Sequence, residues 1–130
     1  MKISEVNVYQ LAGRGWPKYP WIWAEVITDE GITGIGESAP VEGVVEAIGK
    51  IGHRIAGKDP FNIEKIYEEL YRSGSFLPAI SGIEMALWDI VGKKLGTPVY
   101  NLLGGRCHDR IRFILTVSSE EHHTTLKNTP

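Results

Sequence analysis

This sequence has almost no cysteine, and it also lacks the apolar runs of membrane spans and signal peptides. The chain has 130 residues and one cysteine, Cys107, which excludes an internal disulfide framework and is typical of a reducing compartment. No apolar run is long enough to span a membrane, and the start MKISEVNVYQ lacks the unbroken apolar stretch of a signal peptide. We therefore expect a soluble, cytoplasmic protein.

An excess of positive charge is also missing. Fourteen Lys and Arg residues stand against sixteen Asp and Glu residues, for a net charge of −2, and the basic residues are scattered rather than clustered. Nucleic-acid binding therefore has no electrostatic support. A hydrophobic content of 42% and a charged content of 23% are ordinary for a globular chain. The length suits a single domain with a sizeable core.

The first third of the chain has the composition of β-strands. Residues 3–11, 21–28 and 32–38 are rich in β-branched and aromatic residues. Residues 13–20 contain two glycines and two prolines, which favour a loop, and residues 29–31 form a short turn. Successive strands joined in this way predict a three-stranded antiparallel meander.

After Pro40 the apolar period changes from two residues to 3.6, which is the helical period. A first helix is predicted around Val44 to Ile55. Asp59 and Pro60 are the N-cap and first-turn residues expected of a second helix, which ends near Gly74. A third helix runs from about residue 78 to 95 and a short fourth one stops at Gly104. The predicted fold class is α+β, a meander followed by a bundle of three to four helices.

The last part of the chain, from Ile111 onward, begins with strand-like alternation and then turns into small polar residues. Glu120, Glu121, His122 and His123 resemble metal ligands in isolation. Adjacent residues cannot easily all face one ion, so a solvated, disordered terminus is the preferred interpretation.

Motifs of established chemistry are missing as well. The sequence has no HExxH, no phosphate-binding glycine loop and no nucleophile paired with a base. Gly34 and Gly36, like Gly13 and Gly15, form a short GxG pattern that does not extend into a dinucleotide fingerprint, so we interpret all four as turn glycines. Because Gly34 and Gly36 also lie in the third predicted strand, close backbone approach or a bulge is a second interpretation for these two.

Two acids lie in the third predicted helix. Glu84 and Asp89 are five residues apart, about 140° around a helix, and cannot share a carboxylate site. Asp89 and Lys93 have the spacing of an ordinary surface ion pair. We expect both acids to be structural.

A long pattern of spaced residues runs through the third and fourth predicted helices. It comprises Ala79, Ser81, Gly82, Ile83, Glu84, Ala86, Leu87, Asp89, Ile90, Gly92, Lys93, Pro98, Val99, Leu102, Leu103 and Gly104. This pattern resembles the first signature of the mandelate racemase/muconate lactonizing enzyme family, which belongs to the enolase superfamily. Upstream, DEGITGIGES looks like the third strand of that family, and Asp59 and Pro60 look like the opening of its second helix.

The resemblance covers only the N-terminal capping domain of such enzymes. It implies residues 1–109 as that domain and residues 110–130 as the start of a barrel strand followed by a tail. The catalytic (β/α) barrel, with its acid/base residues and its Mg²⁺ ligands, is absent. We therefore expect a truncated chain that has no catalytic residue, metal site or cofactor of its own. Its missing partner would be the barrel domain.

The resemblance also implies a function for the complete enzyme. That function is Mg²⁺-dependent abstraction of the proton α to a carboxylate, with dehydration or cycloisomerisation of a sugar acid as the leading reaction and racemisation or epimerisation as the next. Capping domains contact the substrate through two loops, here residues 13–20 and 39–43. The candidate substrate-capping residues are Arg14, Trp16, Lys18, Tyr19 and Val41.

Two further expectations remain open. An exposed, mobile loop without function is an alternative for residues 13–20, and a stand-alone binding or interaction module is an alternative for the chain. A capping domain without its barrel exposes apolar surface, so self-association is expected, with a strand at residues 112–117 as its possible edge.

Overall fold

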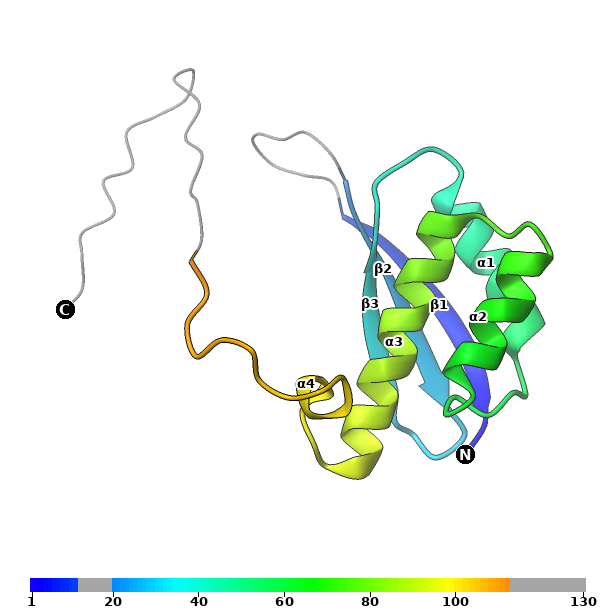
Figure 1. The fold of residues 1–130 in the computed structure, drawn as a ribbon. Helices are drawn as coiled ribbons and strands as arrows, with labels where there is room; N and C mark the ends of the chain where they lie inside the picture. The colour runs from blue at the N-terminus through cyan, green and yellow to red at the C-terminus, as the bar shows by residue number, and fades with distance from the viewer. Residues whose placement is uncertain (12–19, 113–130) are drawn as a thin grey trace, which may run out of the picture.

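Three strands come first in the chain and pair in the order in which they occur. The computed structural model describes residues 1–11 and 20–112. Strands β1 (Ile3–Leu11), β2 (Trp21–Thr28) and β3 (Thr33–Ser38) form one antiparallel sheet in the order β1-β2-β3. The predicted meander is confirmed (Figure 1).

Alternation along β2 decides which face of the sheet is covered. Ile22, Ala24 and Val26 are buried, whereas Trp21, the first residue of β2, points to the other face and is 51% exposed. Val26 pairs with Val6 of β1 and with Gly34 of β3, so these residues point to the same side. A sheet with one face on the core and one open face follows from this period of two.

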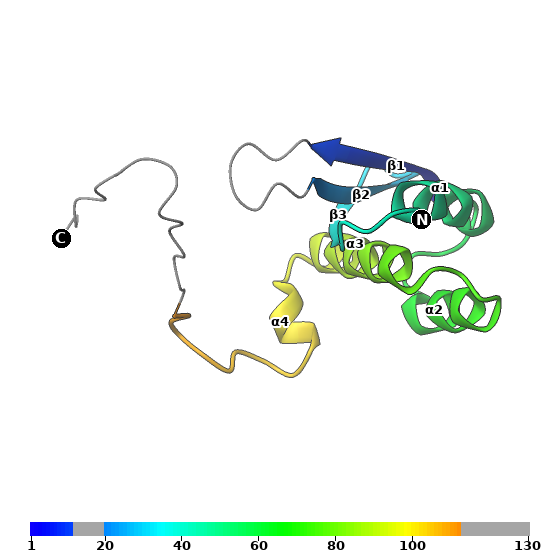
Figure 2. The same cartoon turned by 90° about the horizontal axis from the view of Figure 1, so that it is seen from above.

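Within residues 39–112, four helices follow the sheet. They are α1 (Val44–Ile55), α2 (Ile63–Arg72), α3 (Leu77–Leu95) and the one-turn α4 (Val99–Leu102). Helices α1 and α3 pack on the same face of the sheet, and α2 packs against α3 on the outside (Figures 1 and 2). The α+β class is confirmed, and no barrel forms within residues 1–11 and 20–112.

The core lies between the sheet and the two covering helices. Isoleucine dominates it, with Ile48, Ile51, Ile83 and Ile90 at 2% exposure or less. Because α3 is covered on one side by the sheet and on the other by α2, it is apolar around most of its circumference.

The predicted start of the second helix was wrong by three residues. Helix α2 begins at Ile63, and its N-cap is Asn62 rather than Asp59. The carboxylate of Asp59 accepts a hydrogen bond from the Phe61 N–H at 2.9 Å, and the Asn62 N–H donates to the Asp59 carbonyl. Asp59 and Pro60 therefore form a separate turn before the helix, because the side chain of Asp59 bonds to the backbone two residues on.

For Gly34 and Gly36 the predicted close backbone approach is confirmed, and the interpretation as turn glycines was wrong. Both lie inside β3, where α3 approaches the strand closely. A Cβ atom on Gly34 would lie 2.0 Å from the Ala86 carbonyl oxygen, and one on Gly36 would lie 2.0 Å from the Gly82 carbonyl oxygen. Only glycine permits this contact between helix backbone and strand backbone.

The chain beyond α4 has no regular structure as far as it is described. Residues 106–112 lead away from the rest of the domain (Figure 1), and Ile111 is 86% exposed. The predicted strand from Ile111 does not begin at residues 111–112. The rest of that strand and the polar tail with its Glu and His residues lie outside the described residues.

Candidate functional site

The residues that flank the first predicted substrate loop lie at the same end of the sheet as the second predicted segment, residues 39–43. Antiparallel pairing places the end of β1 beside the start of β2, since Gln10 pairs with Ile22. It also places the end of β3 there, since Ile22 pairs with Ser38. The end of β1, the start of β2 and the segment between β3 and α1 therefore lie at the same end of the sheet (Figure 1).

A hollow of about 310 Å³ lies at this end of the sheet. Its lining combines residues at the ends of β1 and β2 with four residues of the second segment and the first turn of α1: Gln10, Pro20, Ile22, Pro40, Val41, Glu42, Gly43, Val45 and Glu46. Residues more than thirty positions apart in the chain thus form one surface, which we call the capping hollow.

Local hydrogen bonds give the segment at residues 39–43 a defined shape. The Val41 N–H donates to the Ala39 carbonyl at 2.9 Å, and the Val44 N–H donates to the Val41 carbonyl at 3.3 Å. Gly43 is the N-cap of α1 and has a φ of 83°, a left-handed conformation that favours glycine. The Val41 side chain remains 44% exposed at the hollow.

The predicted capping residues are placed only in part. Val41 lines the capping hollow, as the prediction requires of a residue that contacts a ligand. Arg14, Trp16, Lys18 and Tyr19 lie outside the described residues. Their roles, including that of Val41, therefore stay predictions.

Sequence reasoning missed the polar residues of the hollow. Gln10, Glu42 and Glu46 line it, and none of them was among the predicted capping residues. Their position next to the two predicted loops was the available signal. Both charged residues of the described lining are acidic, so among residues 1–11 and 20–112 this hollow has no cation to bind a carboxylate.

A second hollow of about 530 Å³ adjoins the first and shares Gly43 and Glu46 with it. It lies between α1 and the connection from α2 to α3, and Lys50 and Arg54 contribute its cations. Arg54 Nη1 donates to Ser75 Oγ at 2.9 Å. The Arg54 guanidinium therefore links α1 to the connection that precedes α3.

The described residues do not fit a Mg²⁺ site. Within residues 1–11 and 20–112 no group of three or more His, Cys, Asp or Glu residues converges to hold a metal ion. Magnesium is usually bound through fixed carboxylates in near-octahedral geometry. The acids of the capping hollow, Glu42 and Glu46, are only two in number and are both exposed.

The two acids of α3 have different surroundings. Asp89 Oδ2 accepts a hydrogen bond from the Ile35 N–H at 3.0 Å and from Lys93 Nζ at 2.8 Å. Lys93 Nζ also donates to the Thr33 carbonyl at 2.7 Å. Asp89 and Lys93 form the ion pair that the spacing predicts. In addition, both side chains bond to backbone groups at the edge of β3. Glu84 is half-buried on the same helix.

The described helices include none that is long and apolar enough to cross a membrane. This finding concerns residues 1–11 and 20–112 only, and it agrees with the hydropathy of the sequence.

Comparison with known proteins identifies the family of this domain. The model of the mandelate racemase / muconate lactonizing enzyme, N-terminal domain, matches residues 3–104. A D-galactonate dehydratase of Variovorax paradoxus (strain S110) is 42% identical over 122 residues, which include 86% of this chain and 30% of that protein. The chain therefore spans about 30% of the length of this curated relative.

Solved structures agree in fold and in coverage. A mandelate racemase/muconate lactonizing enzyme-like protein from Roseovarius sp. TM1035 is 36% identical, with a TM-score of 0.74 over 86% of this chain and 32% of that one. A dipeptide epimerase from Enterococcus faecalis V583 is also 36% identical, with a TM-score of 0.73 over 81% of this chain and 33% of that one. With the meander, the helices and 102 matched positions in agreement, the chain belongs to the mandelate racemase / muconate lactonizing enzyme N-terminal domain family.

Proposed function

We propose that this chain is the substrate-capping domain of a sugar-acid dehydratase. The observation that supports this most directly is the capping hollow, where the ends of the two predicted substrate loops meet. The similarity to a D-galactonate dehydratase supports the choice of dehydration and of a sugar acid as substrate. Racemisation or epimerisation is the second candidate, because a dipeptide epimerase is among the structural neighbours.

In this proposal the chain binds and covers the substrate and does not react with it. Since the described lining of the hollow offers only carboxylates as charged groups, Arg14 and Lys18 would supply the cations that attract a substrate carboxylate or its hydroxyls. Trp16 and Tyr19 would lie against the carbon face of the sugar acid, and Val41 would close its apolar edge. Closing such a loop excludes water from the reaction.

The acid/base chemistry would belong to a barrel domain in the complete enzyme. Dehydration begins with removal of the proton α to the carboxylate, which requires a base of tuned pKa beside the substrate. Magnesium is the cofactor expected of the complete enzyme, but the described residues do not fit it, so we assign no step of the reaction to this chain. Cys107 is exposed and free, which supports a reducing compartment such as the cytoplasm.

A chimeric enzyme tests the capping role. Residues 1–104 would replace the equivalent domain of a D-galactonate dehydratase, and the 2-keto acid product of D-galactonate would be measured. We expect activity in the chimera, and a rise in KM of about tenfold or more when R14A or K18A removes a cation. Glu64→Ala, on the exposed surface of α2, is the matched control and should leave KM unchanged. An active chimera that is insensitive to R14A, W16A, K18A, Y19A and V41A alike would contradict the capping role.

The chain alone tests the division of labour. Purified and supplied with D-galactonate and Mg²⁺, it should form no product, and calorimetry should detect no Mg²⁺ binding tighter than about millimolar, the range of weak sites. A stoichiometric site in the micromolar range would overturn the proposal that catalysis belongs to a separate domain.

A further inference from the structure

The face of the sheet opposite the helices is open, apolar and acidic. Cross-strand pairing puts Tyr9, Trp23 and Glu37 in one row and Asn7, Glu25 and Ile35 in the next. Leu11 and Trp21 form a third row at the end of the sheet. Four of these side chains are large, apolar or aromatic, and about half exposed: Tyr9, Leu11, Trp21 and Ile35. An exposed patch of this kind on one continuous surface is typical of an interaction site.

Hydrogen bonds hold the acidic part of this face in place. Tyr9 Oη donates to Glu25 Oε2 at 2.8 Å, and Asn7 Nδ2 donates to the same oxygen at 3.2 Å. The bond to Glu25 also raises the pKa of Tyr9 above its ordinary value, so the phenol stays a neutral donor. Glu25 is thereby oriented on the face.

The charges of the face all have one sign. Glu5, Glu25 and Glu37 lie on it, and the strands place no Lys or Arg side chain there within the described residues. Two copies of the chain could not stack these faces directly, because their carboxylates would oppose one another. A basic partner has the charge that complements this surface.

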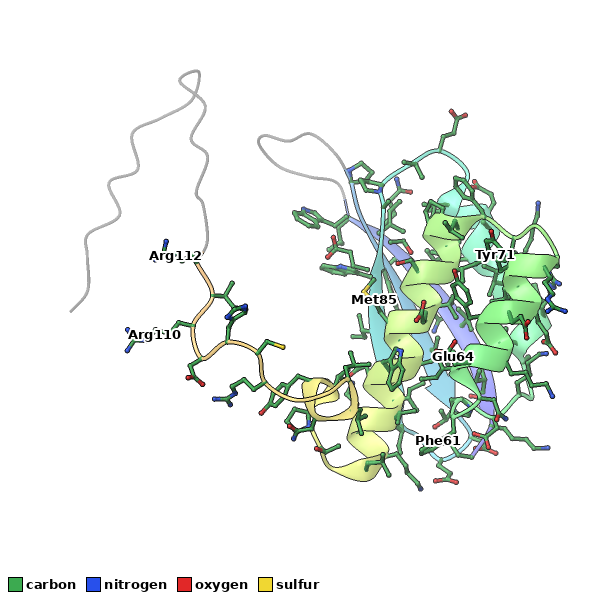
Figure 3. The ribbon with its side chains drawn as sticks, viewed as in Figure 1. Phe61, Glu64, Tyr71, Met85, Arg110 and Arg112 are labelled. Carbon is green, nitrogen blue, oxygen red and sulfur yellow. The ribbon has the colours of Figure 1, made fainter. Side chains whose placement is uncertain are left out.

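The segment at residues 106–112 has the complementary charge. It contains three arginines and one aspartate in seven residues. Arg106 is engaged within its own chain, where its guanidinium lies 5.5 Å from the ring centroid of Tyr100. Arg110 and Arg112 point away from the sheet of their own molecule (Figure 3), and Ile111 between them is 86% exposed. The basic segment is therefore presented outward rather than packed on its own domain.

The spacing of the two sets of charges agrees. Glu37 lies opposite Trp23, two residues from Glu25, so the two acids are diagonal neighbours about 7–8 Å apart. In an extended segment, Arg110 and Arg112 would be about 6.8 Å apart on the same side. An extended segment that crosses the face can therefore pair both arginines with both acids, while their guanidinium planes lie near Trp21 and Trp23.

We propose that the open face of the sheet binds the 106–112 segment of a second copy of this chain. Two copies exchange these segments reciprocally, so the contact closes as a two-fold symmetric dimer. The contact consists of Arg110 and Arg112 of one copy on Glu25 and Glu37 of the other, over the aromatic surface of β1 and β2.

Charge reversal in the 130-residue chain tests this proposal, with sedimentation equilibrium as the readout. Wild type should form a dimer at about 50 mM salt and a weaker one at about 500 mM, where screening shortens the reach of the charges. E37R and R112E should each weaken the dimer by about tenfold or more. Arg112 lies outside the packed core, so R112E should leave the fold intact. It therefore tests the contact even if E37R destabilises the sheet. Glu64→Arg, on the exposed surface of α2 (Figure 3), is the control and should leave the dimer unchanged.

Mixing the two variants separates exchange between copies from docking within one chain. An E37R copy and an R112E copy together restore both contacts of an exchanged dimer, so the mixture should dimerise as strongly as wild type. If each segment lay on its own face, mixing would restore nothing, and that result would overturn the proposal. A wild-type chain that stays monomeric at every concentration, or a dimer that resists both reversals, would overturn it as well.

Discussion

At the scale of single residues, Gly36 decides how closely the sheet and its longest helix approach. A Cβ atom there would lie 2.0 Å from the Gly82 carbonyl oxygen and 2.8 Å from the Ala86 N. We expect Gly36→Ala to lower the free energy of unfolding by about 3 kcal/mol, at the upper end for an overpacked site, because α3 must move away from β3. Urea unfolding followed by circular dichroism measures this.

Gly49 is the matched control for that substitution. It lies inside α1, and a Cβ atom there would meet nothing within 4 Å. Gly49→Ala should therefore raise the free energy of unfolding, by about 0.5–1 kcal/mol, through the better helix propensity of alanine. A loss of stability in both variants would mean that the close contact with α3 is not the reason why Gly36→Ala destabilises the fold.

Asp89 is the second residue with an effect beyond its own helix. Its carboxylate accepts from the Ile35 N–H at the free edge of β3. In Asp89→Ala that N–H loses its partner, so we expect faster hydrogen exchange at Ile35 and a stability loss of about 1 kcal/mol. Exchange monitored by NMR checks this, with the amide of Ala24 in the central strand as the internal reference. Unchanged exchange at Ile35 would show that the bond does not protect this edge.

At the scale of secondary-structure elements, two carboxylates join separate parts of the fold. Lys58, before α2, bonds to Glu69 on α2, and Lys94 at the end of α3 bonds to Glu30 in the β2–β3 turn. These bonds lower the pKa of both Glu69 and Glu30 below the ordinary value of 4.5. A lowered folded-state pKa stabilises the fold above that value, and this stabilisation is lost as the pH falls through the folded-state pKa.

We therefore expect the free energy of unfolding to fall as the pH is lowered from about 5 to 3. The E30Q/E69Q double variant should show a smaller decrease over this range, because neither side chain can gain a proton. Urea titrations at several pH values measure both. The same pH dependence in the variant and the wild type would exclude these two pairs as its source. Both carboxylates are solvent-exposed, so the effect should also weaken in high salt.

At the scale of the whole molecule, the packed unit ends near α4. Every helix and strand of the described residues lies within residues 3–102, and residues 106–112 have no regular structure. Brief trypsin treatment should therefore cut after Arg110 or Arg112 before it cuts after Lys93 or Lys94, which lie in the last turn of α3. Mass spectrometry identifies the products. Early cleavage inside α3 would mean that this helix is not held by the sheet.

The sequence by itself determined most of the secondary structure. The strands and α1 and α3 begin and end within one or two residues of the predicted positions, because the apolar period and the terminal glycines are local signals. Gly96, with a φ of 61°, ends α3 where the pattern places its stop. The start of α2 could not be read in this way, since the same Asp and Pro pair that opens a helix also forms a turn.

Only the tertiary structure decided the contacts between distant residues. The element that approaches Gly34 and Gly36 is α3, and Asp89 bonds to Ile35, 54 positions away. In the capping hollow, Gln10 and Val41 lie on one surface because β2 pairs with both of its neighbours. Periodicity along the chain reports which side of an element is buried, but not which element covers it, because that choice depends on how the sheet and α3 fit together.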